Sequence, residues 1–179
     1  DPPRKEVPAA IQLCRESHIH VLMITGDHPD TATAVAREIG LGVGEPKVIT
    51  AQEINPQLLN RDFLHTLDVV ARATPSQKLT IVNTLKNAGD IVAVTGDGVN
   101  DVPALKAANI GIAMGGHGTQ SAREAADIVL LDDNFGSIVN AIAEGRQLFK
   151  NLQLSFKYLI MVHMPFIISA AIIPLFGFP

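Results

Sequence analysis

The strongest constraint in the sequence is a carboxyl-terminal stretch, residues 158–179, that contains no Asp, Glu, Lys or Arg. Its length is about what a helix needs to cross the hydrocarbon core of a bilayer. Core helices of soluble proteins usually carry polar residues along one face, whereas this stretch offers only His163 and Ser169 besides its tyrosine. The sequence therefore predicts a transmembrane helix over residues 158–179, with a buried core helix as the alternative.

The residues just before that stretch indicate its orientation. Lys150 and Lys157, with Arg146 further back, flank its amino-terminal side, and positive charge gathers on the cytoplasmic side of membrane helices. From Ser137 onward, apolar residues recur at close to helical spacing, with no turn signal before the apolar stretch. We therefore expect a stalk helix over residues 134–157 that continues into the membrane, with residues 1–157 on the cytoplasmic side.

Residues 1–133 alternate short apolar runs with helical patterns, which is typical of α/β folds. Strands are expected at residues 21–25, 69–73, 91–95, 110–114 and 128–131, with a strand fragment and a helix within 48–67. Helices are expected at residues 7–16, 30–38 (capped by Asp30), 77–87, 102–108 and 122–126. Aromatics are only 4% of the chain, so the core must be aliphatic, as in parallel sheets buried on both faces. The sequence predicts a Rossmann-like parallel sheet flanked by helices.

The charge and the cysteine content exclude two further features. The formal net charge is -4, which gives no general attraction to nucleic-acid phosphates. We therefore expect no nucleic-acid partner. The lone cysteine, Cys14, rules out an internal disulfide and is expected to be a small core residue.

Two expected strands end in the same tripeptide, Thr25-Gly26-Asp27 and Thr95-Gly96-Asp97. Ligands of open α/β sheets bind beyond the carboxyl ends of the strands, so both tripeptides can face one crevice. The threonine offers a hydroxyl, the glycine lets backbone N–H groups approach a phosphate, and the aspartate offers a carboxylate to a metal ion. One such tripeptide would be an ordinary turn, but two after apolar runs indicate a phosphate and metal site.

The second tripeptide is followed by further oxygen-bearing side chains. Asp97, Asn100 and Asp101 crowd together at the expected start of a helix, and Gly98 permits a tight turn between them. Two close carboxylates repel each other unless a cation or a proton lies between them. Mg²⁺ is the natural candidate, because it takes one or two carboxylates together with phosphate oxygens. The alternative is that Asp101 only caps the helix.

Lys78 lies in the first turn of the helix that follows Pro75. A single lysine on a helix is usually a solvated surface residue. A helix start already favours anions, however, so an ammonium group there can neutralise a phosphoryl group. Residues 115–118 lack the lysine and the spacing of a phosphate-binding loop, and we interpret them as a flexible turn.

Taken together, these motifs resemble the P-type cation-transporting ATPases of the haloacid dehalogenase superfamily. The resemblance covers nearly the whole chain in the right order, and VTGDGVND is its most specific signature. It rests on the opening DPPR at 1–4, MITGDHPDTA at 23–32, ARATPSQK at 71–78, VTGDGVNDVPAL at 94–105, GIAMG at 111–115, ADIVLLDDNF at 126–135 and EGR at 144–146. It implies that residues 1–133 are the carboxyl-terminal part of the phosphorylation domain.

The resemblance implies catalytic and metal-binding roles for matching residues. Asp97 and Asp101 are expected to hold Mg²⁺, and Asn100 to support the metal and the phosphate. Lys78 is expected to stabilise the phosphoaspartate through which such pumps couple ATP hydrolysis to transport. The expected catalytic residues are Asp27, Lys78, Asp97, Asn100 and Asp101.

The resemblance also implies contacts with ATP, the second expected ligand. Thr25, Gly26 and Asp27 are expected to bind the transferred phosphoryl group or the nucleotide phosphates, together with Lys78 and Asn100. Arg72 is expected to reach the nucleotide. Arg4 is expected in a hinge strand returning from a nucleotide-binding domain.

This sequence departs from the family pattern at its nucleophile. The motif Asp-Lys-Thr-Gly-Thr does not occur in the chain, and we expect the chain alone to be inactive. Asp132 follows an apolar strand without that context, and we interpret it as a surface carboxylate. The actuator domain, the nucleotide-binding domain and the other membrane helices are expected partners. The alternatives are a catalytically dead nucleotide- or Mg²⁺-binding regulatory module and a soluble phosphatase of the same superfamily.

The membrane stretch differs from calcium-type pumps at the positions of their ion ligands. Where calcium-type pumps carry an Asn and a Glu that bind the ion, this chain has His163 and Phe166 with Pro165 between them. Pro165 is expected to kink the helix and free backbone carbonyls as cation ligands. His163 is either a functional group or a side chain hydrogen-bonded to a neighbouring helix. The sequence therefore does not predict which cation is transported.

Overall fold

The computed structural model describes residues 3–175 of the chain. The chain divides into two compact units, Asp1–Val139 and Asn140–Pro179, which are described separately. The last positions of the expected membrane helix, residues 176–179, lie outside the described residues, as do the first two residues of the opening motif.

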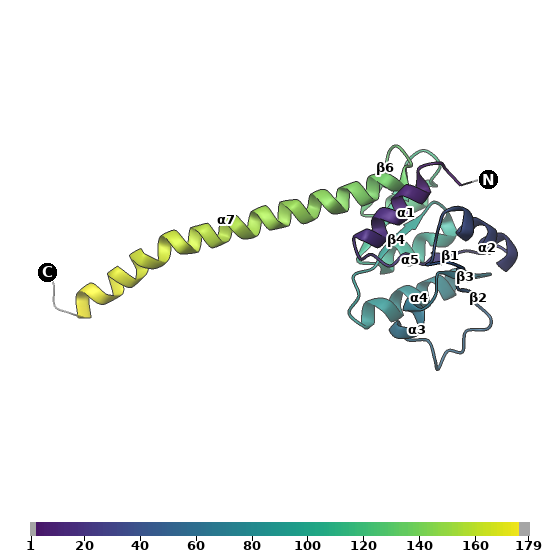
Figure 1. Cartoon of the computed structure of the whole chain (residues 1–179), viewed down its shortest axis with the longest axis horizontal. Helices are drawn as coiled ribbons and strands as arrows, with labels where there is room; N and C mark the ends of the chain where they lie inside the picture. The colour runs from purple at the N-terminus through teal and green to yellow at the C-terminus, as the bar shows by residue number, and fades with distance from the viewer. Residues whose placement is uncertain (1–2, 176–179) are drawn as a thin grey trace. The chain divides into compact units, whose positions relative to one another are not determined.

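The strands of the first unit form two parallel sheets, each of three strands (Figure 1). The first sheet has the order β1-β3-β2, with β1 at Met23–Ile24, β2 at Val48–Thr50 and β3 at Val69–Ala71. The second has the order β4-β5-β6, with β4 at Ala93–Gly96, β5 at Ile110–Met114 and β6 at Ile128–Leu130. The prediction of a parallel α/β fold is confirmed, but the strands divide into two sheets where one was expected.

The helices alternate with the strands, as the sequence predicts. They are α1 (Val7–Glu16), α2 (Pro29–Glu38), α3 (Arg61–His65), α4 (Pro75–Asn87), a 3₁₀ turn (Val99–Asp101), α5 (Val102–Ala107), α6 (Gln120–Ala125) and α7 (Phe135–Leu175). At α4, Thr74 accepts a hydrogen bond from the Gln77 amide while the Gln77 side chain returns to Thr74, so the start of the helix is fixed. The expected cap of α2 is wrong. His28 is the cap residue, and its side chain accepts from the Asp30 amide, because Asp30 already lies inside the first turn.

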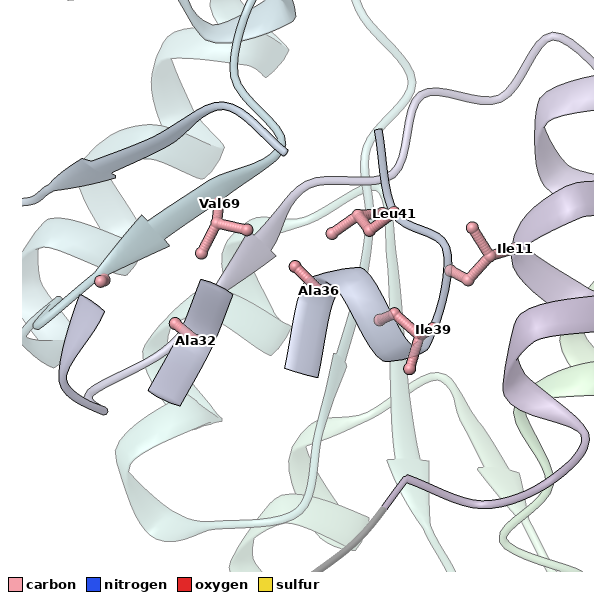
Figure 2. Packing of buried hydrophobic residues seen from close by; sticks show 7 residues of the cluster. Ile11, Ala32, Ala36, Ile39, Leu41 and Val69 are labelled. Carbon is pink, nitrogen blue, oxygen red and sulfur yellow. The ribbon is translucent and has the colours of Figure 1, made fainter. Parts of the chain in front are cut away.

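The first sheet is covered on both faces. Successive side chains of a strand point to opposite faces, and Val69 and Val70 of β3 are both fully buried. Figure 2 shows Val69 facing Ala32 and Ala36 of α2. Val70 packs on the other face with residues of α3 and α4, among them Leu64 and Ile81. Full burial of one such valine contributes about 1.5–3 kcal/mol, so β3 is the centre of this core.

The second sheet is covered less evenly. Leu105 of α5 and Ala122 of α6 pack with Ala113 of β5 on one face. On the other face, the paired residues Ala93 and Ile110 are both exposed. β4 is also an edge strand among the described residues. The strand that carries the second TGD tripeptide therefore has one open edge and one partly open face.

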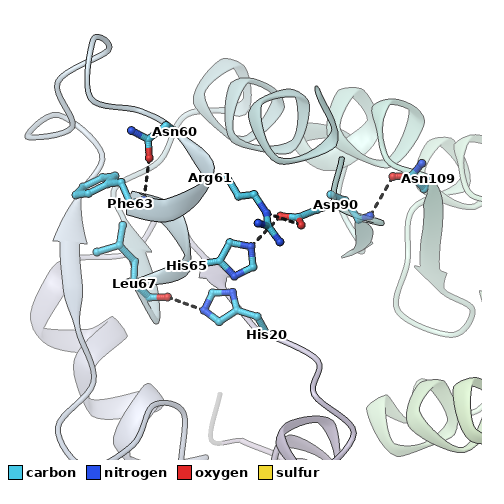
Figure 3. A network of polar contacts seen from close by, with 9 residues as sticks. His20, Asn60, Arg61, Phe63, His65, Leu67, Asp90 and Asn109 are labelled. Carbon is cyan, nitrogen blue, oxygen red and sulfur yellow. Dashed lines mark hydrogen bonds and ion pairs between the residues drawn. The ribbon is translucent and has the colours of Figure 1, made fainter. Parts of the chain in front are cut away.

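A polar network lies before β1 and β4, at the amino-terminal ends of these strands (Figure 3). Asp90 accepts from Arg61 Nε at 2.7 Å and pairs with His65 Nε2 at 2.8 Å. The His20 ring lies 4.9 Å from that of His65, and its Nε2 is 3.1 Å from the Leu67 carbonyl. The hydrogen bond from His65 is the largest of several causes that lower the pKa of Asp90. Burial, followed by the nearby His65, lowers the pKa of His20.

α7 is one continuous helix over Phe135–Leu175, which confirms the prediction that no turn interrupts it. Its segment Phe135–Ala170 is long and apolar enough to cross a membrane. The polar groups inside the apolar stretch bond within the helix: His163 Nδ1 lies 2.8 Å from the Leu159 carbonyl, and Ser169 Oγ donates to the Pro165 carbonyl. Satisfied in this way, they cost less to bury in lipid.

Candidate functional site

The first TGD tripeptide lies at the carboxyl end of β1 and is fixed by its backbone. The Thr25 carbonyl accepts from the Ala73 amide at 2.9 Å, and the Asp27 carbonyl accepts from the Arg72 amide at 3.0 Å. Thr25 Oγ1 also accepts from the Asp27 amide. The structure therefore brings Thr25, Asp27 and Arg72 together at the ends of β1 and β3. The Asp27 side chain is exposed and is not engaged in an ion pair anywhere in residues 3–175.

An ion pair ties α4 to the turn that follows the second TGD tripeptide. Lys78 Nζ of α4 lies 2.7 Å from Asp101 Oδ1, and the two side chains are only 19% and 15% exposed. Asp101 Oδ2 accepts from the Gly98 amide at 3.3 Å. Asp101 makes no capping bond to α5, so the alternative that it only caps the helix is wrong. Asp97 and Asn100, which precede Asp101 in the same turn of the chain, are both exposed.

Gly96 is required by the same geometry. A Cβ added there would lie 2.5 Å from the Asp101 Cβ, which is closer than real carbon contacts. Any side chain at Gly96 would therefore displace Asp101, the partner of Lys78. The tripeptide needs its glycine to let the ion pair form.

Asp133, which the sequence did not single out, holds the loop after β5. Asp133 accepts from the backbone amides of Gly116 and His117, both at 3.0 Å, and its Oδ2 lies 2.5 Å from His117 Nδ1. Asp133 is only 6% exposed. The hydrogen bond from His117, then that from Gly116, lowers the pKa of Asp133 to about 2. Hydrogen bonds to Asp133 therefore hold residues 116 and 117, and the flexibility of this turn stays a prediction.

That loop reaches the candidate metal ligand. The Thr119 amide donates to the Asp97 carbonyl at 2.8 Å, and Thr119 Oγ1 caps α6. By contrast, Asp132 is exposed and bonds only to its neighbours Asn134 and Ser137. This agrees with the interpretation of Asp132 as a surface carboxylate. The left-handed backbone of Asp133, with φ at 50°, is not visible in the sequence.

The expected site residues form two groups. One contains Thr25, Asp27 and Arg72, and the other contains Lys78 and Asp101 with Asp97 beside them. Within residues 3–175, no hydrogen bond or ion pair joins the first group to the second. The cavity of about 320 Å³ beside His20 and Asp68 lies at the other ends of β1 and β3. The expectation that one crevice unites the two tripeptides stays a prediction.

The residues present fit Mg²⁺ only as part of a larger ligand set. No group of three or more His, Cys, Asp or Glu side chains that could hold a metal occurs among the described residues. Mg²⁺ usually takes one or two protein carboxylates, with water and phosphate oxygens completing its octahedron. Asp97, whose carboxylate makes no ion pair within residues 3–175, and Asp101, whose two oxygens accept from Lys78 and the Gly98 amide, supply that number. The donor chemistry is therefore compatible with a magnesium ion bound together with a phosphate.

The fold and the site define a class: an α/β domain whose polar residues gather at the carboxyl ends of parallel strands, joined to an apolar helix. The family profile described as haloacid dehalogenase-like hydrolase matches residues 1–109. The chain belongs to this family of hydrolases.

Within this family, the chain is similar to cation-transporting ATPases. The chain is 43% identical to a calcium-transporting ATPase of Bacillus cereus, over 99% of this chain and 20% of the relative. It is 42% identical to the sodium/potassium-transporting ATPase subunit alpha-A of Artemia franciscana, over 92% of this chain and 19% of the relative. A solved zinc-transporting PIB-type ATPase in its E2.Pi state superposes with a TM-score of 0.68 and 30% identity, over 93% of this chain and 24% of that one. The chain thus spans about a fifth of the length of the curated relatives it matches.

Proposed function

We propose that this chain is the Mg²⁺- and phosphate-binding part of the phosphorylation domain of a P-type cation-transporting ATPase. In this proposal residues 1–133 belong to that domain, residues 134–157 form a stalk, and residues 158–179 cross the membrane. The proposal rests on the Lys78–Asp101 pair and the exposed Asp97 carboxylate four residues earlier, in a chain that resembles such pumps throughout.

The two carboxylates share one task in this proposal. Asp97 and Asp101 hold Mg²⁺, and the exposed Asn100 amide supports the metal and the phosphate. Mg²⁺, when bound, supplies positive charge that neutralises phosphate oxygens. Lys78 keeps Asp101 in place at 2.7 Å and offers the remaining donors of its ammonium to the phosphoryl group.

The other group of residues binds phosphate and nucleotide. The Thr25 hydroxyl and the backbone amide of Gly26 bind a phosphoryl group, and Asp27 supports its transfer. Arg72, whose amide bonds the Asp27 carbonyl, extends its exposed guanidinium to ATP. Both groups have to act on one phosphate, so the site is completed when a further segment brings them together.

The phosphorylated aspartate would come from such a segment. The Asp-Lys-Thr-Gly-Thr motif does not occur in this sequence, and both β1 and β4 are edge strands among the described residues. A parallel strand of a longer protein can pair with either edge, and it would then end beside the TGD tripeptide of that edge strand. Its aspartate would lie where parallel sheets bind their ligands.

The membrane helix contributes to the path of the cation. Pro165 has no N–H to donate to the Met161 carbonyl, so this oxygen is free to bind a cation. His163 is the one ionisable side chain among residues 159–175, and ionisable groups within membranes are functional candidates. We assign both to the transport path of a cation whose identity is open.

A chimaera tests the proposal. The matching segment of the calcium-transporting ATPase of Bacillus subtilis, 45% identical over 163 residues, is replaced by this chain up to Lys157, so that the host keeps its own membrane helices. We expect the chimaera to hydrolyse ATP with Mg²⁺ and Ca²⁺ dependence. A chimaera that folds and inserts but hydrolyses no ATP would contradict the proposal.

A further inference from the structure

We propose that Asp133 is a positioning residue that holds the metal ligand Asp97 in place through the loop formed by residues 115–119. This inference rests on the proposed function, because it is Asp97 as a magnesium ligand that needs to be held. Asp133 itself touches neither phosphate nor metal. It acts through the backbone of another segment.

The first step is the set of hydrogen bonds between Asp133 and the loop. Its carboxylate accepts from the amides of Gly116 and His117 and from the His117 ring. Bonds to an ionised acceptor are roughly twice as strong as neutral ones. The Asp133 side chain is buried, whereas the His117 ring that donates to it is 76% exposed. The carboxylate thus fixes the direction in which the loop leaves β5.

The second step is the close packing of the loop at its glycines. A Cβ added at Gly116 would lie 2.8 Å from Asp133 Oδ2, and one added at Gly118 would overlap the Met114 carbonyl. Both glycines are therefore needed for the backbone to approach so closely. The loop therefore packs closely on the Asp133 carboxylate at Gly116 and on the Met114 backbone at Gly118.

The third step is the contact with the site. Thr119 ends the loop, and its amide donates to the Asp97 carbonyl at 2.8 Å. The hydroxyl of Thr119 caps α6, which fixes this residue from its other side. The backbone that carries the Asp97 carboxylate is thereby anchored across the sheet to Asp133.

Asp133 also bonds to the beginning of the chain. Arg4 Nη1 donates to the Asp133 carbonyl at 2.6 Å. Two residues later α7 begins, and its Phe135 and Val139 pack with Ala10 and Cys14 of α1. The residue that holds the loop is therefore itself held by two elements of the first unit.

Hydrogen–deuterium exchange of the complete 179-residue chain in detergent tests this chain of contacts. Asp133→Asn keeps the shape of the side chain and removes its charge. We expect exchange of residues 115–119 and of residues 97–100 to rise by roughly 10- to 100-fold, as loss of hydrogen bonds to a charged group implies, while β3 is unchanged. Asp132→Asn is the matched control, and it should leave both segments as they are.

Mn²⁺ binding, followed by electron paramagnetic resonance of the same chain, supplies the functional readout. We expect Asp133→Asn to weaken Mn²⁺ binding several-fold, His117→Ala to weaken it less, and Asp132→Asn to leave it unchanged. Faster exchange confined to residues 115–119, or equal Mn²⁺ binding by Asp133→Asn and the unaltered chain, would overturn the inference. Failure of the unaltered chain to bind Mn²⁺ would instead count against the metal assignment, and exchange at residues 97–100 would still decide the positioning.

Discussion

Lys78 Nζ lies 2.7 Å from the Asp101 carboxylate, and the two side chains are only 19% and 15% exposed. The residues are 23 positions apart, so the pair ties α4 to the turn that follows β4. Removing one member of an ion pair this shielded from water lowers the stability of the fold, because the remaining charge loses its charged partner. It is therefore a structural element of the fold as well as the centre of the candidate site.

Removing one member of this pair should lower stability. We expect Lys78→Met to reduce the free energy of unfolding of residues 1–157 by about 1.5–3 kcal/mol, the usual value of a hydrogen bond to a charged group. The double variant Lys78→Met/Asp101→Asn should recover part of that loss, because no unpaired charge remains. Urea unfolding measures both. Additive losses in the double variant would show that the two residues do not interact in solution.

The histidine network should make stability depend on pH. The pKa of His20 is lowered in the fold, so the unfolded chain binds a proton more readily. The contribution of His20 is complete above its ordinary pKa of 6.5 and is lost as the pH falls below that value. The groups facing His20 are His65, Asp68 and Asp90, of which the two carboxylates oppose the shift.

Thermal unfolding of residues 1–157 between pH 8 and pH 5 tests this dependence. We expect the midpoint to fall toward pH 5, and His20→Gln to flatten the profile. His18→Asn is the control, since asparagine accepts the left-handed backbone of residue 18. A profile that His20→Gln leaves unchanged would refute the assignment.

The apolar helix should govern solubility. Each central Leu or Ile contributes about -0.5 kcal/mol to membrane insertion, and residues 158–179 carry no formal charge to oppose it. We expect the full chain to require detergent and the chain ending at Lys157 to remain soluble and folded. High-speed centrifugation separates the two outcomes. If the full chain stays monomeric in the supernatant without detergent, the stretch packs against protein and does not enter lipid.

The bounds of several elements could be predicted because they are local. Val7–Glu16, Ile110–Met114 and the continuity of α7 follow from spacing, turn residues and the lack of a helix stop within a few positions. The division of the strands into two sheets could not be predicted, because it depends on which distant strands pair. Asp133 was missed for the same reason, because the amides it binds lie 16 and 17 positions away. Its local sequence contains two adjacent aspartates and gives no sign of which one binds a loop.

The chain by itself should not form a phosphoenzyme. Mg²⁺ and Lys78 stabilise charge on a phosphoryl group only when a nucleophile attacks it, and no Asp-Lys-Thr-Gly-Thr motif is present in the sequence. We expect no acid-stable label after incubation with radiolabelled ATP and Mg²⁺. A hydroxylamine-sensitive labelled band would show that another aspartate accepts the phosphate, and Asp132 would be the first to examine.

The most direct measurement is phosphoenzyme formation in the Bacillus subtilis chimaera carrying single substitutions. Asp97→Ala removes the exposed carboxylate that we assign to Mg²⁺, and we expect labelling from radiolabelled ATP to fall at least 100-fold, as the loss of roughly 3 kcal/mol of electrostatic stabilisation implies. Asp132→Ala removes a surface carboxylate, and labelling should stay within about twofold of the unsubstituted chimaera, the scale of a change well under 1 kcal/mol. Equal labelling of Asp97→Ala and the unsubstituted chimaera would contradict the account.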